Sequence, residues 1–225
     1  MNITSYKTVL ATVASLSALT LATQAQSVVF TFSDATSDGW ANSGFGDTPA
    51  ATVVNISGQN YISLPVGGFQ VGNVTSSTST LSDFGPAMAA AAANPAGYQI
   101  SYNYYIDTST WTGSPTYLQV GTFVNSGSGY YAQDYGSPRQ LQLDGTAMAS
   151  GLVYSGTVSV TLAASAYAIP TADTFFRLGL IVNSNGTGVV DFTDISVAPV
   201  PEPSTFALCA LSSLGGMWAL RRRKA

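Results

Sequence analysis

Apolar and polar residues alternate with a period of two through much of residues 26–199, a pattern that restricts this part of the chain to β-structure. The clearest example is 97–107, where Tyr98, Ile100 and Ile106 share one face and Ser101 and Tyr105 lie on the other. The alternation predicts strands at 97–107, 116–126, 157–163, 174–183 and 188–197, and shorter apolar runs predict strands at 28–32, 51–56, 61–64, 69–74, 130–133 and 140–143. Strands of this length, separated by Gly, Ser and Asn turns, predict an all-β fold: an antiparallel jelly-roll β-sandwich.

Two local signals add detail to this prediction. The run Asn183, Ser184, Asn185, Gly186 is a turn signal, so we expect 174–183 and 188–197 to pair as a hairpin. Residues 86–93 hold six alanines between Asp83 and an Asn-Pro pair, which predicts one short surface helix joining two strands.

Residues 26–199 have the size of one domain and carry few charges. This segment contains ten aspartates and two cations, Arg139 and Arg177, which gives it a net charge of −8. Such a surface repels phosphate backbones, so we expect no binding to nucleic acid. The single cysteine, Cys209, lies outside this domain, which therefore has no disulfide to support its core.

The residue types missing from the domain restrict its chemistry. Residues 26–199 contain no His, Glu, Lys or Cys. This composition excludes serine-hydrolase triads, cysteine nucleophiles, Schiff-base lysines and His-ligated zinc. Two aspartates could serve a glycosidase, but the sequence singles out no pair among the ten. We therefore expect a protein that is not an enzyme.

Residues 1–25 have the layout of a secretory signal peptide. One cation, Lys7, precedes an apolar segment at 9–21. The small residues Thr23 and Ala25 stand at positions −3 and −1 relative to a cut after Ala25. We expect signal peptidase to cut after Ala25 and the rest of the chain to be exported.

Residues 200–225 consist of a proline-rich elbow, an apolar run and a basic end. The elbow is Pro201, Glu202, Pro203 and Ser204, and the basic end is Arg221, Arg222, Arg223 and Lys224. As a helix, 203–220 would be about 27 Å long, close to the roughly 30 Å of a membrane's hydrocarbon core. The four cations stop transfer and favour the cytoplasmic side, so a single transmembrane helix is predicted. The alternative, a buried terminal helix, gives no role to the elbow or the cations.

The order of these three blocks resembles the PEP-CTERM sorting tail of Gram-negative bacteria that make exopolysaccharide. The resemblance rests on 201–204, the apolar run and the Arg-rich end, and does not extend into the domain. It implies recognition by exosortase, a membrane-embedded cysteine protease or transpeptidase. It further implies an inner-membrane anchor through the C-terminal helix, then a place at the cell surface or in the extracellular matrix after processing.

The two ends of the domain loosely resemble carbohydrate-binding modules of the jelly-roll type. The first strand ends at Asp34, shortly before the pair Gly39 and Trp40, and the last strand carries Asp194. In such modules these ends often share a structural calcium ion, and carboxylate oxygens suit Ca²⁺. No cofactor is required, but Asp34 and Asp194 form the predicted calcium pair. The alternative is a polar turn at Asp34 and a solvent-facing Asp194.

Four aromatic residues fall in or beside Gly- and Ser-rich connections: Trp111, Tyr130, Tyr131 and Tyr135. Rings presented from such positions could stack on sugars. Packing in the core or across strands is the alternative for each of them. The functional prediction is a non-catalytic surface or matrix protein, with a module that recognises extracellular polysaccharide as the alternative.

Overall fold

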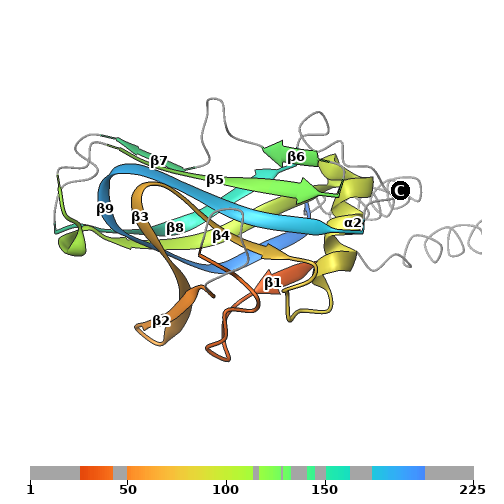
Figure 1. The fold of residues 1–225 in the computed structure, drawn as a ribbon, viewed down its shortest axis with the longest axis horizontal. Helices are drawn as coiled ribbons and strands as arrows, with labels where there is room; N and C mark the ends of the chain where they lie inside the picture. The colour runs from red at the N-terminus through yellow and green to blue at the C-terminus, as the bar shows by residue number, and fades with distance from the viewer. Residues whose placement is uncertain are drawn as a thin grey trace, which may run out of the picture.

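The computed structural model describes residues 26–42, 50–113, 117–127, 129–132, 141–144, 151–162 and 174–200. Its strands are β1 (Val28–Phe30), β2 (Thr52–Ile56), β3 (Gln59–Thr75), β4 (Tyr98–Asp107), β5 (Tyr117–Ser126), β6 (Gly129–Ala132), β7 (Leu141–Asp144), β8 (Val153–Thr161) and β9 (Phe176–Pro199). One α-helix, α2 (Phe84–Ala93), and two short 3₁₀ turns, Pro95–Gly97 and Thr108–Thr110, lie between the strands (Figure 1). Within the described residues all strand pairs are antiparallel, which confirms the antiparallel all-β part of the predicted fold.

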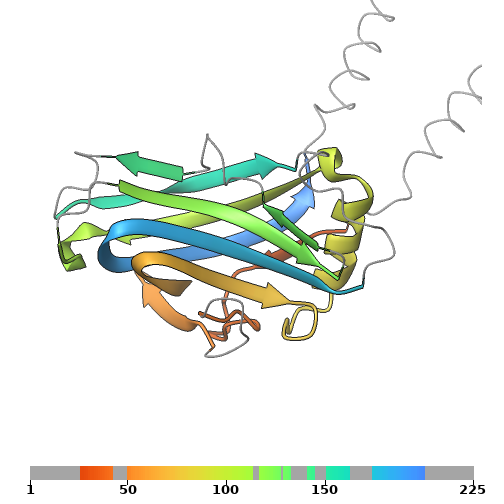
Figure 2. The same cartoon turned by 45° about the horizontal axis from the view of Figure 1, so that its top comes forward.

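The strands form two layers that share β3 and β9. The first layer has the order β2, first half of β3, second half of β9, β4 and β8, with β1 also paired to β9. The second layer holds the second half of β3, the first half of β9 and β5, and β6 and β7 both pair with β5. In Figure 2, β9 runs along one layer, turns back at one end of the molecule and returns along the other.

The crossing between layers is marked by a register shift in the β3–β9 pairing. Gly67 pairs with Thr187 and Gly68 with Ser184, so two residues of β9 have no counterpart in β3 at this bulge. The predicted hairpin between 174–183 and 188–197 is therefore wrong: the two segments are halves of β9 in opposite layers, each paired to β3. The turn signal instead serves the bend, where the Ser184 hydroxyl accepts from the backbone N–H of Gly186 at 3.1 Å.

The core lies between the layers, where the alternating apolar residues meet. Ile100, Tyr102 and Ile106 of β4 are buried against the first half of β9, represented by Leu178 and Leu180. This agrees with the face predicted from 97–107, and it leaves the polar half of the alternation on the outer side of the first layer.

Helix α2 covers one end of the sandwich (Figures 1 and 2). It buries Phe84, Ala87, Met88, Ala91 and Ala92, so the predicted surface helix is in fact part of the core. The alanines allow close approach, and the Phe84 ring fills the remaining space beside the ring of Phe30, 5.9 Å away between centroids.

Within the described ranges, no helix has the length and apolar character needed to cross a membrane. The predicted signal peptide at 1–25 and the predicted C-terminal helix with its elbow and basic end lie outside the described residues.

Candidate functional site on the outer face of the first layer

A row of three residues crosses the middle of the first layer on its outer side. Ser63 of β3 is paired with Asp191 of β9, which is paired with Tyr105 of β4. Their neighbours Ile62 and Phe192 are buried in the core, so the row points the other way. Together with two adjacent residues it forms what we call the outer patch: Tyr61, Ser63, Tyr105, Asp191 and Asp194.

Two tyrosine rings of the outer patch lean toward each other across β9. Tyr61 stands on β3 and Tyr105 on β4, two strand spacings apart, or roughly 9.6 Å. Their ring centroids are nevertheless only 6.1 Å apart, with an angle of 52° between the planes. Both side chains are half-buried. The rings therefore form a partly exposed aromatic pair above the intervening strand.

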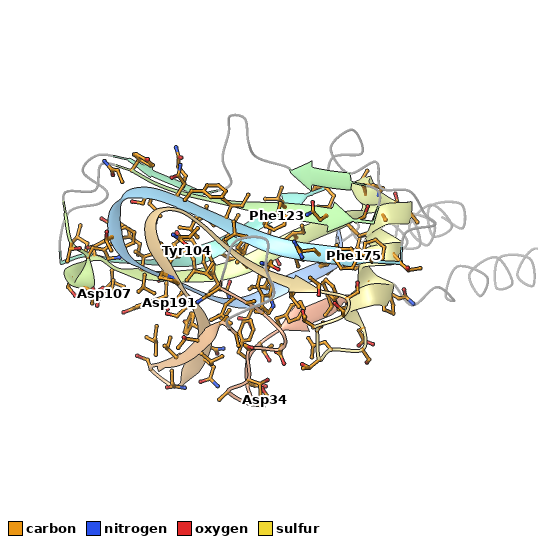
Figure 3. The ribbon with its side chains drawn as sticks, viewed as in Figure 1. Asp34, Tyr104, Asp107, Phe123, Phe175 and Asp191 are labelled. Carbon is orange, nitrogen blue, oxygen red and sulfur yellow. The ribbon has the colours of Figure 1, made fainter. Side chains whose placement is uncertain are left out.

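Asp191 lies on the strand between these rings and is 8% exposed. Its Oδ1 accepts a hydrogen bond from the Ser63 hydroxyl at 2.5 Å, and the described residues supply no second donor to this carboxyl. Burial raises the pKa of Asp191, and the bond from Ser63 acts in the opposite direction. Figure 3 shows Asp191 within the body of the sheet, whereas Asp34 lies at the tip of a loop.

Asp194 is held near the Tyr61 ring by a local irregularity of β9. The register of β9 on β4 shifts here, and Asp194 adopts φ = 50°, in the left-handed region. Its Oδ2 accepts from the Asn103 amide at 2.7 Å, and Asn103 in turn accepts from the Thr157 hydroxyl at 2.6 Å. Burial, followed by the carboxylates of Asp194 and Asp191, raises the pKa of Tyr61. Both carboxylates thus act on one phenol.

The predicted calcium pair has separate local partners in the structure. Oδ1 of Asp34 accepts from the backbone N–H of Thr36 at 3.1 Å and from its hydroxyl at 2.8 Å, which lowers the pKa of Asp34. Asp194 is bonded to Asn103. Ca²⁺ takes about six to eight oxygen ligands. Among the described residues no group of three or more His, Cys, Asp or Glu could hold a metal ion. The calcium site stays a prediction.

The predicted stacking residues have different fates. Trp111 is 9% exposed and belongs to the core, where its indole lies so close to Gly188 that a Cβ there would be 2.3 Å from the ring. At 9% exposure the ring offers little surface to a sugar, so Trp111 is a core residue. Tyr130 and Tyr131 are paired with Asn125 and Val124 of β5. Stacking by these two tyrosines stays a prediction, and Tyr135 lies outside the described residues.

Sequence reasoning did not single out Tyr61, Tyr105 or Asp191. A signal for Tyr105 was present, because it is an aromatic residue at a polar position of a clearly alternating strand. Asp191 carried a similar signal, an acidic residue inside a strand rather than in a turn. Their meeting depends on β9 lying between β3 and β4, which no local pattern encodes.

The architecture defines a class of protein, the two-layer antiparallel β-sandwich with one covering helix. Within the sequence, residues 199–224 match the PEP-CTERM protein-sorting motif. The chain therefore carries this sorting signal, as the elbow, apolar run and basic end predicted. The motif overlaps the sandwich only at Pro199, the last residue of β9.

Solved structures similar to this chain include carbohydrate-binding modules with low sequence identity. A non-crystalline cellulose specific module, CBM28, has 13% identity and a TM-score of 0.49, with 74% of this chain and 90% of that chain covered. The CBM22-1 xylan-binding domain of Paenibacillus barcinonensis Xyn10C has 10% identity and a TM-score of 0.42, with 77% and 93% covered. CBM27-1 of Caldicellulosiruptor saccharolyticus, solved with mannohexaose, has 10% identity and a TM-score of 0.41, with 76% and 95% covered. No curated protein matches the sequence.

Proposed function

We propose that this chain is an exported, non-catalytic protein that an exosortase-type system delivers to the cell surface or extracellular matrix. The observation that carries the proposal is the sorting motif at 199–224. In this proposal a jelly-roll domain, 26–199, lies between a signal peptide and a C-terminal transmembrane helix. The producing cell is a Gram-negative bacterium that makes exopolysaccharide.

The order of processing follows from the segments. Signal peptidase removes 1–25, and the apolar run then holds the protein in the inner membrane with Arg221–Lys224 in the cytoplasm. Exosortase next acts near Pro201–Ser204. β9 ends at Pro199, and the N–H of Val200 donates to the carbonyl of Gly97 at 2.9 Å. The elbow thus follows directly after the folded domain.

Intact mass of the protein recovered from the cell surface or medium tests this function. We expect the mature form to lack both 1–25 and the residues after the elbow, with any transferred group appearing as added mass. A variant with Pro201→Ala and Pro203→Ala is the matched control and should be exported but remain uncut. A mature surface form that still carries Trp218 and the basic end would contradict processing.

A second candidate function, recognition of extracellular polysaccharide, is favoured by the outer patch. The patch combines two half-buried tyrosine rings with two carboxylates on an outward-facing sheet. Aromatic rings together with a few placed polar groups are typical of small-molecule and sugar sites. Binding would retain the protein in the matrix after the tail has been removed.

A further inference from the structure

We propose that the outer patch is a binding site for an uncharged polysaccharide, with Tyr61 and Tyr105 contacting sugar rings and Asp191 accepting from a sugar hydroxyl. This inference rests on the polysaccharide-binding function proposed above and gives it a location and a ligand class.

The tyrosine pair supplies the apolar contact. A ring pair whose centroids are 6.1 Å apart and which leans across β9 leaves the outer sides of both rings directed away from each other. The C–H face of a pyranose is apolar and flat enough to lie against such a ring, as other flat ligands do. Because the rings stand on different strands, successive sugars of a chain crossing the strands can meet them in turn.

Asp191 supplies the hydrogen-bond acceptor. A carboxylate at 8% exposure that receives one bond from Ser63 has unused acceptor capacity, because a carboxylate accepts about four hydrogen bonds. A buried acceptor that lacks hydrogen-bond donors costs free energy, so a donor from a ligand is bound favourably at such an oxygen. Sugar hydroxyls are donors, and Asp191 lies on β9, the strand between the strands that carry the two rings.

The polar surroundings extend the patch along the sheet. The amide of Gln59 donates to the Thr193 hydroxyl at 3.1 Å, and the hydroxyls of Ser101 and Ser196 are 2.7 Å apart. Thr157, at the other end of the Asn103 network, is exposed. These groups can donate to or accept from hydroxyls, so the face beside the patch suits a hydroxyl-rich chain.

Charge selects among polysaccharides. Asp191 and Asp194 are the charged groups of the patch, which contains no Lys or Arg, and Arg177 lies on the half of β9 that belongs to the other layer. Two carboxylates repel uronic-acid or sulfated polymers. An uncharged polymer avoids this repulsion, and its binding should be insensitive to salt because no ion pair forms.

Affinity gel electrophoresis of the full chain in a mild non-ionic detergent tests the proposal. The gels contain one of four uncharged polymers, hydroxyethylcellulose, arabinoxylan, galactomannan or dextran, or the polyanion alginate. We expect at least one uncharged polymer to retard the protein equally at low and high salt, and alginate not to do so. No retardation by any uncharged polymer, or retardation that high salt abolishes, would overturn the ligand class.

Four variants then test the location with the polymer that binds. Tyr105→Ala and Asp191→Asn should each weaken retardation by about tenfold or more, whereas Tyr105→Phe keeps the ring and should retain it. Phe69→Ala is the control, because Phe69 is an exposed aromatic residue, 47% accessible, on the other layer. The melting temperature of each variant identifies loss of fold.

The outcomes separate this inference from the proposed function. If Phe69→Ala abolishes retardation and a folded Tyr105→Ala protein is retarded like the wild type, the outer patch is not the binding site. Polysaccharide binding itself would still stand in that case. Loss of binding in Tyr105→Ala with Tyr105→Phe unaffected supports the patch. The intact-mass experiment stands apart from both, since it reports on sorting alone.

Discussion

Burial at Asp191 favours the protonated carboxyl, because the charged form loses hydration. The hydrogen bond from Ser63 favours the charged form, but the effect of burial is larger. The folded-state pKa therefore lies above the ordinary value of 3.8. Between the ordinary pKa and the raised folded-state pKa, the folded protein binds more protons than the unfolded chain. The contribution of Asp191 to the free energy of unfolding therefore falls as the pH rises through this range. Asp107 contributes with the opposite sign, because hydrogen bonds from the Ser109 side chain and backbone lower its pKa.

Replacement of Asp191 by Asn tests this pH dependence. The amide keeps the shape and can still accept from Ser63 through Oδ1, but it removes the charge. We expect Asp191→Asn to have a higher free energy of unfolding than the wild type near pH 7, with the difference vanishing at about pH 3. Urea titrations at both pH values measure it.

Asp107→Asn is the matched control for this prediction. It should show no such gain near neutral pH, because the charged form of Asp107 is the favoured one in the folded state. A destabilised Asp191→Asn protein at neutral pH would show instead that the ionised carboxylate has a stabilising partner.

Single residues differ in how far their roles were predictable from sequence. Alternation placed Ile100 and Tyr102 in the core correctly, because side-chain direction in a strand is fixed locally. Trp111 could not be assigned in this way, since it stands outside the strands and its burial depends on Gly188 far along the chain. Asp191 became a candidate only through its cross-strand neighbours Ser63 and Tyr105.

At the scale of elements, β3 and β9 determine how the two layers connect. Each was predicted as two strands, because the Gly pair at 67–68 and the turn residues at 183–186 resemble breaks. The same residues can form a bend within one continuous strand when the neighbouring strand bends with it, as β3 and β9 do. Local composition cannot distinguish these cases, since the difference lies in which strand is hydrogen-bonded beyond the bend.

The bend in β3 gives a test with a matched neighbour. Gly68 has φ = 94°, whereas a Cβ on Gly67 would make ordinary contact with the Thr187 hydroxyl at 3.7 Å. Although space is open at Gly68, its backbone disfavours any L side chain. We expect Gly68→Ala to lower the free energy of unfolding by about 1 kcal/mol or more and Gly67→Ala to change it by a few tenths.

Urea midpoints of these two variants compare the effects directly. Equal midpoints would mean that the bend relaxes without cost and that the positive φ of Gly68 does not restrict the residue there.

At the scale of the whole molecule, the sorting motif and the sandwich were predictable to different degrees. The motif is a contiguous segment, so sequence alone identified it and the match at 199–224 confirms it. The sandwich was predictable as an antiparallel all-β class from alternation. Its strand order was not, because pairing of β9 with β1, β3, β4 and β5 depends on contacts between distant parts of the chain.

The predicted calcium pair is also tested on the whole molecule, through thermal stability. If Asp34 and Asp194 share an ion in the folded state alone, free Ca²⁺ at about a hundredfold its dissociation constant stabilises the protein by about 2.7 kcal/mol. The melting temperature should then be higher with Ca²⁺ than with a chelator, and Asp34→Asn should abolish the difference. Identical melting curves with Ca²⁺ and with chelator would contradict the predicted calcium site at Asp34 and Asp194.

The central position of β9 has a consequence for the timing of folding. It is the last strand before the sorting motif, yet it pairs with β3 and β5 in one layer and with β1, β3 and β4 in the other. A nascent chain that has emerged only as far as residue 175 lacks the middle of both layers and cannot close its core. If the proposed export runs alongside synthesis, the polypeptide therefore crosses the membrane unfolded. It acquires its native shape only when residues 176–199 have emerged, at which moment the membrane still holds the tail that follows.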